Sequence, residues 1–267
     1  MQYLIFYVKM KIVIIGAGNL ATNIGVALSR AGHDILQVYS RTMQSATNLA
    51  EKLKCDCTTD VDAISDEAEL YVFSVKDSAL AELVSKVCAR HAGKCFAHTA
   101  GSIPMSVFCG HAKRFGVLYP LQTFSKNKLL DFKEIPLFVE GSDVQTKSIL
   151  RQVAESLSSK VFLLDSDRRK YLHLSAVFAC NFVNHCYALA SDILSEQGLD
   201  YDVLLPLINE TAAKVGQMKP ANAQTGPAVR YDENVIGMQA ELLKDNQMVH
   251  DIYLLMSKSI AKKSGKL

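Results

Sequence analysis

The sequence lacks any run of about 20 apolar residues, the length that a membrane-spanning helix needs. It also lacks a marked excess of charge of either sign, because 29 Lys and Arg residues are balanced by 27 Asp and Glu residues, for a net charge of +2. This balance leaves no excess of positive charge with which to bind nucleic acid. We therefore expect neither a membrane nor a nucleic acid as a partner.

Paired cysteines are missing as well. The seven cysteines are odd in number and contain no Cys-x-x-Cys pair, and one residue alone separates Cys55 from Cys57, which is too short for the usual metal knuckle. We therefore expect reduced thiols in a cytoplasmic protein, with no disulfide framework and no metal site.

The length of 267 residues suits one large domain or two modest ones, and the composition of 49% hydrophobic and 21% charged residues is ordinary for a soluble globular protein. Residues 1–9 are apolar, but they have neither a basic leader nor a small-residue cleavage site. They form either an extension before Met10 or a little edge structure, and we assign them no function.

The stretch from Lys11 to Gly25 has the pattern of a dinucleotide-binding strand, turn and helix. A β-branched run at residues 12–15 leads into Gly16, Gly18 and Ala21, and the pattern of an amphipathic helix follows. The first glycine allows a sharp turn, and the second lets the backbone approach a pyrophosphate at the helix N-terminus. The alternative is a purely structural turn, since glycines often follow strands.

The next predicted strand, residues 34–39, ends in Ser40, Arg41 and Thr42 without an acidic residue. An acid there would bind the ribose 2′-hydroxyl and repel a 2′-phosphate. Arg41 can instead hold that phosphate in a charge-assisted contact of roughly 1.5–3 kcal/mol, or about one to two decades of affinity. This favours NADP over NAD and argues against a methyltransferase, although a solvated arginine is the plain alternative.

Strands and helices alternate up to about residue 165, which predicts an α/β fold with a doubly wound parallel sheet. The predicted strands are 12–15, 34–39, 55–58, 70–74, 94–98, 116–119, 137–140 and 161–164, with helices up to residue 31 and over 42–53 and 144–157. Ligands of such sheets bind beyond the carboxyl ends of the strands.

The residues expected at this edge to bind the cofactor come from the glycine turn and from the ends of several strands. They are Gly16, Ala17, Gly18, Asn19, Leu20, Ser40, Arg41, Thr42, Ser74, Val75, Lys76, His98 and Thr99. Two of them have a plain alternative, because His98 is equally well explained as a core histidine and Lys76 as a solvated side chain.

After Asp165 the pattern becomes helical. Residues 167–197 contain no Gly or Pro and place apolar residues at helical spacing, which predicts one long helix that stops at Gly198. One side of this helix carries His173, Val177, Asn181, Asn184 and Ala188. Polar groups in an apolar helix are costly unless they are paired or face a wet cleft. They therefore form either a substrate-binding face or hydrogen-bonding contacts between helices.

Further helices are predicted for 201–216, 232–243 and 246–262, and a polar loop over 219–232 has Gly226-Pro227 at its centre. Polar loops of this kind often bind ligands, although Gly-Pro also simply sets a turn. Thr225 and Arg230 in this loop are the predicted substrate-binding residues. Because no sheet covers the apolar faces of these helices, we expect a homodimer formed through the helical half.

Taken in order, the motifs resemble a known family. They are Ile-Gly-Ala-Gly-Asn-Leu-Ala, Tyr-Ser-Arg-Thr, Val-Phe-Ser-Val-Lys-Asp, His98-Thr-Ala-Gly-Ser, Tyr119-Pro-Leu-Gln-Thr-Phe, Tyr171-Leu-His-x4-Phe-Ala-Cys-Asn181 and Thr225-Gly-Pro-x2-Arg-x-Asp232. Over nearly the whole length after Met10, the chain resembles the Rossmann-like NADP oxidoreductases that carry a C-terminal helical domain of unknown function. These are relatives of pyrroline-5-carboxylate reductase and of the deazaflavin-dependent NADP oxidoreductases.

The resemblance implies a Rossmann-type NADP-binding domain, residues 1–165, followed by an all-α domain for substrate binding and dimerisation, residues 166–267. Two positions depart from the family pattern. Tyr119 stands where His-Pro is common, and Leu172 separates Tyr171 from His173, which are adjacent in the family.

These observations predict an NADPH-dependent reductase of a small carbonyl or imine compound. His173 is expected to be the general acid, since histidine titrates near neutral pH, and Asn181 to orient the substrate. Arg230 is expected to bind a substrate carboxylate, with Thr225 beside it. Two alternatives remain open, a non-catalytic NADP-binding sensor or assembly protein and a true pyrroline-5-carboxylate reductase.

Overall fold

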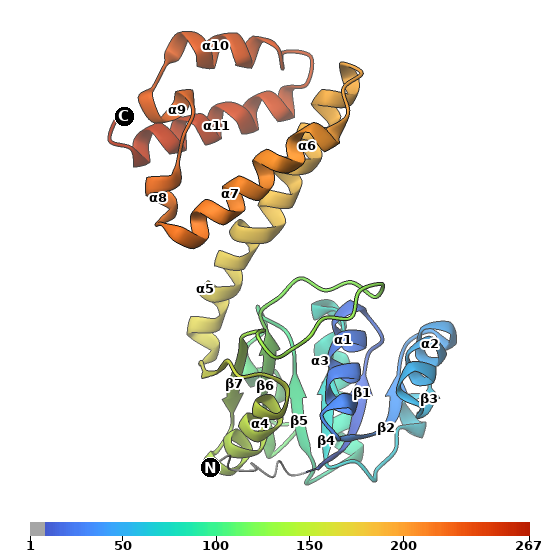
Figure 1. Cartoon of the computed structure of the whole chain (residues 1–267). Helices are drawn as coiled ribbons and strands as arrows, with labels where there is room; N and C mark the ends of the chain where they lie inside the picture. The colour runs from blue at the N-terminus through green and yellow to red at the C-terminus, as the bar shows by residue number, and fades with distance from the viewer. Residues whose placement is uncertain (1–8) are drawn as a thin grey trace, which may run out of the picture. The chain divides into compact units, whose positions relative to one another are not determined.

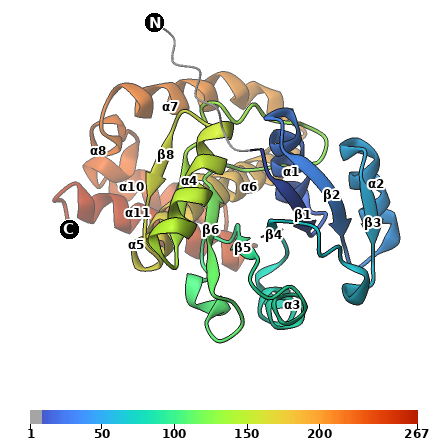
Figure 2. The ribbon, with the colours of Figure 1, turned by 90° about the horizontal axis from the view of Figure 1, so that it is seen from below.

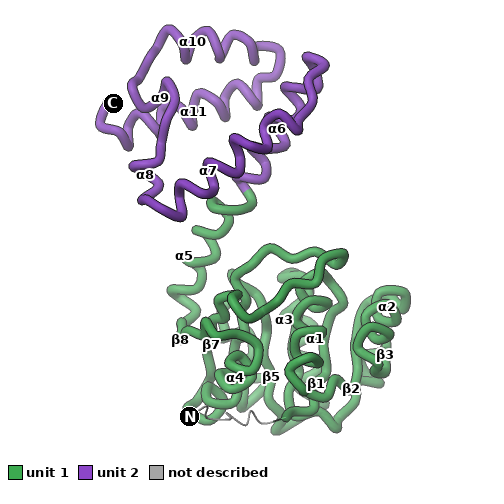
Figure 3. The backbone as a smooth tube through the Cα atoms, in the orientation of Figure 1, with its two compact units in different colours: residues 1–181 green, residues 182–267 purple. Residues whose placement is uncertain are grey.

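The computed structural model describes residues 9–267, and the edge structure considered for residues 1–9 lies almost entirely outside that range. The contacts divide the chain into two compact units, one ending at Asn181 and the other comprising Phe182–Leu267 (Figure 3). This division falls inside the helical run that begins at Ser166. The domain boundary predicted after residue 165 stays a prediction.

The first unit is built on one eight-stranded sheet in the order β3-β2-β1-β4-β5-β6-β7-β8 (Figure 1). Its strands are β1 (Lys11–Ile15), β2 (Asp34–Tyr39), β3 (Asp56–Thr58), β4 (Leu70–Phe73), β5 (Cys95–His98), β6 (Arg114–Pro120), β7 (Leu137–Gly141) and β8 (Val161–Leu163). Strands β1 to β6 are mutually parallel, and this confirms the predicted α/β class.

The sheet is not wholly parallel, however. Strand β7 runs antiparallel to β6 and parallel to β8, so the last two strands are reversed. A loop without a helix, residues 121–136, connects β6 to β7. A parallel neighbour would require a crossover connection, whereas an antiparallel one does not. The predicted parallel sheet is therefore confirmed for β1 to β6, and the last two strands depart from it at this edge.

Helices cover both faces of the sheet (Figure 2). Helices α1 (Asn19–Arg30), α2 (Met43–Leu53) and α4 (Val144–Leu157) pack on one face, and α3 (Asp77–Arg90) and the 3-10 turn η2 (Met105–Phe108) pack on the other. Alternate residues of β1 enter the two cores: Ile12 and Ile14 lie in the first and Val13 and Ile15 in the second, all fully buried. This two-sided burial explains why the strand reads as an unbroken apolar run.

The predicted single long helix is wrong in its middle. Helices α5 (Ser166–Ala176) and α6 (Val183–Glu196) are joined by η3 (Val177–Phe182), which is π-helical. Because a π turn holds about one residue more than an α turn, the α-helical spacing does not continue through it. The common face inferred for His173 and Asn181 from that spacing is therefore not maintained.

The second unit is helical. After α6 it contains the 3-10 turn η4 (Tyr201–Leu204) and the helices α7 (Leu205–Gln217), α8 (Pro220–Ala223), α9 (Pro227–Arg230), α10 (Glu233–Glu241) and α11 (Gln247–Lys263). The expected polar loop thus contains two single-turn helices, α8 and α9. Each begins with a proline, whose fixed φ favours the first helical position. No helix within residues 9–267 has the length and apolar character needed to cross a membrane.

Candidate active site

A cavity of about 760 Å³ lies in the first unit, at the carboxyl ends of its central strands. Of the predicted cofactor-binding residues, it brings together Gly16, Ala17, Gly18, Asn19, Leu20, Ser40, Arg41, Thr42, Ser74, Val75, Lys76 and Thr99. Only His98 is missing from this group. The cavity is therefore where the βαβ pattern places a dinucleotide.

The glycine turn forms the floor of the cavity. Gly16 has a φ of +121°, and a Cβ atom there would lie 2.2 Å from the carbonyl oxygen of Ser74, so a side chain cannot fit. At Gly18, in contrast, a Cβ would meet nothing within 4 Å. Gly18 is also the N-cap of α1, which has neither a capping side chain nor an acidic residue in its first turn. The first N–H groups of α1 are thus open to a phosphate, and the site fits a dinucleotide.

The charge of the cavity favours an anion. Four cationic side chains line it, Arg41, Lys76, Lys86 and Lys126, against the two carboxylates of Asp77 and Glu82. Glu82 pairs with Lys86 at 2.6 Å, and Asp77 accepts a hydrogen bond from Ser102 Oγ. Within residues 9–267 the other three cations form no ion pair and remain available for a ligand.

His98 is a core residue. Its side chain is fully buried and stacks on Phe108, with the ring centroids 5.8 Å apart, and its Nδ1 accepts a hydrogen bond from the backbone N–H of Ala100. Burial, assisted by the positive charge of Arg169, lowers its pKa to about 3. A neutral, enclosed ring does not reach the cavity, but it fixes the backbone that carries Thr99 and Ala100 into the wall.

A pair of polar side chains lies beside that wall, and the sequence pattern predicted a role in the site only for its histidine. Tyr119 on β6 and His173 on α5 are hydrogen-bonded, with 3.0 Å between Tyr119 Oη and His173 Nδ1. Burial raises the pKa of Tyr119, and the charge of Arg169 opposes this effect. Tyr119 stands at the carboxyl end of its strand, and the sequence pattern already placed it at the ligand-binding edge of the sheet, without a role in the site.

Gly101 permits this arrangement. A Cβ atom at Gly101 would lie 2.5 Å from His173 Nδ1 and 2.9 Å from Tyr119 Cζ. The residue before it, Ala100, lines the cavity. The tyrosine–histidine pair therefore lies directly behind the end of the cavity formed by β5.

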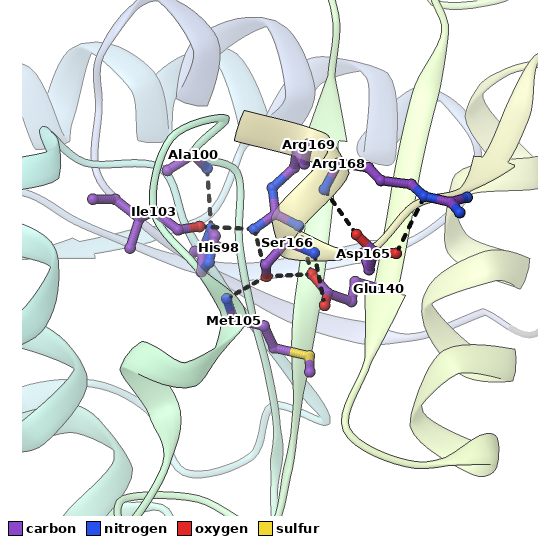
Figure 4. A network of polar contacts seen from close by, with 9 residues as sticks. All are labelled: His98, Ala100, Ile103, Met105, Glu140, Asp165, Ser166, Arg168 and Arg169. Atoms are coloured by element: carbon purple, nitrogen blue, oxygen red, sulfur yellow. Dashed lines mark hydrogen bonds and ion pairs between the residues drawn. The ribbon is translucent and has the colours of Figure 1, made fainter. Parts of the chain in front are cut away.

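A buried ionic network fixes the start of α5 (Figure 4). Arg169, whose side chain is 1% exposed, lies 2.6 Å from a carboxylate oxygen of Glu140 on β7 and donates hydrogen bonds to the carbonyl oxygen of Ile103 and to Ser166 Oγ. Ser166 Oγ in turn donates to Glu140. Because His173 follows Arg169 by about one helical turn, the network also fixes the position of His173 on α5.

The remaining predicted residues belong to other elements. Asn181 is exposed in the π-helical segment η3, and Thr225 and Arg230 are exposed in the second unit, within and beside α9. Their predicted roles in substrate binding stay predictions. Residues 9–267 contain no group of three or more His, Cys, Asp or Glu side chains arranged to hold a metal ion.

Two family models match the chain. One describes a Rossmann-like domain and matches residues 5–121, and the other describes a domain of unknown function, DUF2520, and matches residues 135–260. A search of the curated proteins finds no match.

Solved structures provide nearer relatives. The chain is 51% identical to a putative NADP oxidoreductase from Bacteroides fragilis, with a TM-score of 0.90 over 95% of this chain and 98% of that one. It shares its fold with a reductive aminase from Aspergillus terreus, at 15% identity and a TM-score of 0.73 over 96% of this chain and 93% of that one. It also shares it with 1-pyrroline-5-carboxylate reductase from Streptococcus pyogenes, at 14% identity and a TM-score of 0.62 over 94% of this chain and 99% of that one.

Proposed function

Because this chain belongs to the family of the putative NADP oxidoreductase from Bacteroides fragilis, we propose that it is an NADP-dependent oxidoreductase acting on a small carbonyl or imine compound. The observation that carries the proposal is the cavity itself, with an open helix N-terminus on its floor and a hydrogen-bonded tyrosine–histidine pair behind one end. The fold relatives support the reaction class, since the Aspergillus terreus reductive aminase is seen with NADPH and ethyl levulinate.

The order of the strands indicates in which direction the cofactor lies across the sheet. Arg41 follows β2 and Thr99 follows β5, and the order β2-β1-β4-β5 separates them by about 14 Å at the usual spacing between strands. The glycine turn lies between them, after β1. We infer that the 2′-phosphate binds at Arg41, the diphosphate at the start of α1 and the nicotinamide beside Thr99 and Ala100.

When bound, NADPH supplies the hydride that reduces the substrate carbon. The chain's own part is to hold and deliver the proton. In its protonated form His173 donates a hydrogen bond from Nδ1 to Tyr119 Oη, which orients the ring, and it carries a second proton at Nε2. That proton passes to the substrate oxygen or nitrogen as the general acid step. Asn181, Thr225 and Arg230 are proposed to bind the substrate.

Two measurements test the proposal. Calorimetric titration is expected to show that NADPH binds more tightly than NADH, and a screen of carbonyl and imine compounds is expected to find one that oxidises NADPH. Arg41→Ala should weaken NADPH binding about 10- to 100-fold, because it removes one charge-assisted contact, and should leave NADH binding unchanged. Equal affinities for the two nucleotides, or no binding, would contradict the cofactor assignment. Tight NADPH binding without turnover of any compound would favour the non-catalytic alternative.

We further propose that the second unit forms a homodimer. Helices α6 and α7 contain no buried residue, and large apolar side chains of this unit remain exposed, among them Leu199, Val203, Leu205, Leu207, Val215 and Leu255. Exposed apolar surface of this extent marks an interface, and most oligomers of this kind are two-fold symmetric. Light scattering should report twice the mass of one chain, and Leu207→Asp should reduce it to one. A wild type that runs as a monomer would contradict this proposal.

A further inference from the structure

Lys126 lines the dinucleotide cavity although it lies far from the glycine turn in sequence. It belongs to the connection between β6 and β7, residues 121–136, which passes over the carboxyl ends of the strands toward α1 (Figure 1). Around Lys126 the chain makes a narrow turn closed by a bridge between Ser125 and Lys128. We call residues 125–130 the β6–β7 turn.

One buried side chain of α1 holds both arms of this turn. Asn23, which is 2% exposed, donates from Nδ2 to the carbonyl oxygens of Ser125 and of Asn19, each at 2.9 Å. Its Oδ1 accepts a hydrogen bond from the backbone N–H of Leu130 at 3.0 Å. Because the two arms lie on either side of Lys126, the Asn23 amide fixes the position of the Lys126 backbone.

Aromatic packing holds the chain on both sides of the turn. Phe124 stacks on Phe132, with ring centroids 5.7 Å apart, and Phe132 is 3% exposed within the core that also contains α1. The β6–β7 turn is therefore held by two hydrogen bonds to Asn23 and is flanked by the packed pair of Phe124 and Phe132. These contacts hold the backbone on both sides of Lys126.

The attachment also tells which part of a ligand Lys126 meets. Asn23 bonds to Asn19, the first residue of α1, so the turn lies beside the helix end whose N–H groups are open. Lys126 is exposed and forms no ion pair within residues 9–267. We propose that Lys126 binds the diphosphate bridge of the dinucleotide together with the start of α1, and that Asn23 is its positioning residue. This inference rests on the proposed binding of a nicotinamide dinucleotide.

The diphosphate can be distinguished from the 2′-phosphate by comparing two ligands. Both NADPH and NADH contain the diphosphate, whereas only NADPH has the 2′-phosphate. A lysine on the diphosphate must therefore matter equally for the two nucleotides. The assignment of Arg41 to the 2′-phosphate predicts the opposite pattern, so Arg41→Ala serves as the matched comparison.

The experiment titrates NADPH and NADH into the wild type, Lys126→Met, Lys128→Met and Arg41→Ala, and measures the dissociation constants by calorimetry at low and high salt. Lys126→Met should raise both constants about tenfold at low salt and less at high salt, because an exposed charge is screened. Lys128→Met removes the same charge from the same turn outside the cavity lining, and both constants should stay within about twofold of the wild type, because only weak, screened charge effects remain.

Three results would overturn the inference. Unchanged dissociation constants in Lys126→Met would mean that the lysine does not contact the dinucleotide. A loss of affinity confined to NADPH would mean that the lysine binds the 2′-phosphate instead. An equal loss of affinity in Lys128→Met would mean that the effect comes from general surface charge. If the wild type bound neither nucleotide, the proposed function itself would fail, and this is distinguishable because it needs no variant.

The role of Asn23 is tested by coupling. Asn23→Ala should raise both dissociation constants. Adding Lys126→Met to Asn23→Ala should then raise them by a smaller factor than Lys126→Met does in the wild type, because the lysine is no longer positioned. Thermal unfolding of each variant shows that the compared proteins are folded. Fully additive losses would contradict the positioning role and leave Asn23 as a structural residue only.

Discussion

The two ends of the cavity are built in different ways. At the end formed by the glycine turn and Arg41, the groups proposed to bind the ligand are backbone N–H groups and exposed side chains from one contiguous stretch of about 30 residues. Behind the other end, Tyr119 on β6 meets His173 on α5 from a distant part of the sequence, and Arg169 on α5 pairs with Glu140 on β7. Tyr119 and Arg169 are buried. The first end should therefore control affinity, and the second should control stability and chemistry.

The largest expected effect is on stability at the Arg169 end. Arg169→Ala leaves Glu140 as an unpaired, largely buried carboxylate and should lower the free energy of unfolding by about 3–5 kcal/mol. Urea denaturation followed by circular dichroism measures this loss. The adjacent Arg168, whose side chain is 80% exposed, is the control, and Arg168→Ala should change the free energy by less than about 0.5 kcal/mol. Equal losses in the two variants would show that burial of the ion pair is not the cause.

The next effect is on chemistry at the same end. Once a substrate is known, His173→Ala should lower kcat about 10²- to 10⁴-fold, the usual contribution of a general acid, while the Kd for NADPH stays unchanged. Tyr119→Phe removes only the hydrogen bond to the ring and should cause a smaller loss of kcat. His111→Ala, at an exposed histidine outside the site, is the control. Unchanged turnover in His173→Ala would contradict the acid role.

A smaller effect concerns pH and again distinguishes the two ends. The folded state holds the pKa of His98 at about 3, against 6.5 for an ordinary histidine. The unfolded chain therefore binds a proton at His98 that the folded chain does not, so stability is lost as pH falls from about 6.5 toward 3, at up to about 1.4 kcal/mol per pH unit.

His98→Asn keeps an acceptor for the Ala100 N–H and should flatten this slope in urea denaturation between pH 6.5 and 4. His33 and His91 also have lowered pKa values because of burial, and they contribute the same slope to both proteins. An unchanged slope in the variant would mean that His98 is not the group responsible.

The smallest effect is at the glycine turn, where affinity should change without stability. Gly18 has extended backbone angles that any residue adopts, and a Cβ there meets open space. Gly18→Ala should leave the free energy of unfolding within about 0.5 kcal/mol of the wild type and weaken binding of both nucleotides, because the methyl group occupies the approach to α1. Gly16→Ala, at a φ of +121°, should instead destabilise the fold. Identical behaviour of the two variants would contradict the separate roles assigned to the glycines.

This contrast also explains how far sequence reasoning reaches. The bounds predicted for β2 and α4 agree with the structure, because apolar periodicity and local capping determine them; Asp143, for example, caps α4 through the N–H of Thr146. The reversed strand β7 and the π-helical segment η3 were not predicted, since both depend on packing against distant parts of the chain.

The candidate site follows the same rule. The glycine turn and Arg41 were found because a βαβ unit places them together by local geometry alone. Arg169 was missed because its neighbours in sequence are charged and exposed, and only the fold reveals that Glu140 and the carbonyl group of Ile103 surround it. Lys126 was missed for a similar reason, since Asn23 fixes it from a distance of about 100 residues in sequence.

The β6–β7 turn has a practical consequence, because its exposed lysines make it a natural site for trypsin. Lys126 and Lys128 both lie in a loop without regular structure, where proteases cut most readily. A ligand that engages Lys126 and steadies the turn against α1 would shield these peptide bonds. The rate at which trypsin cuts between β6 and β7 would then report occupancy of the cavity directly, before any substrate is known.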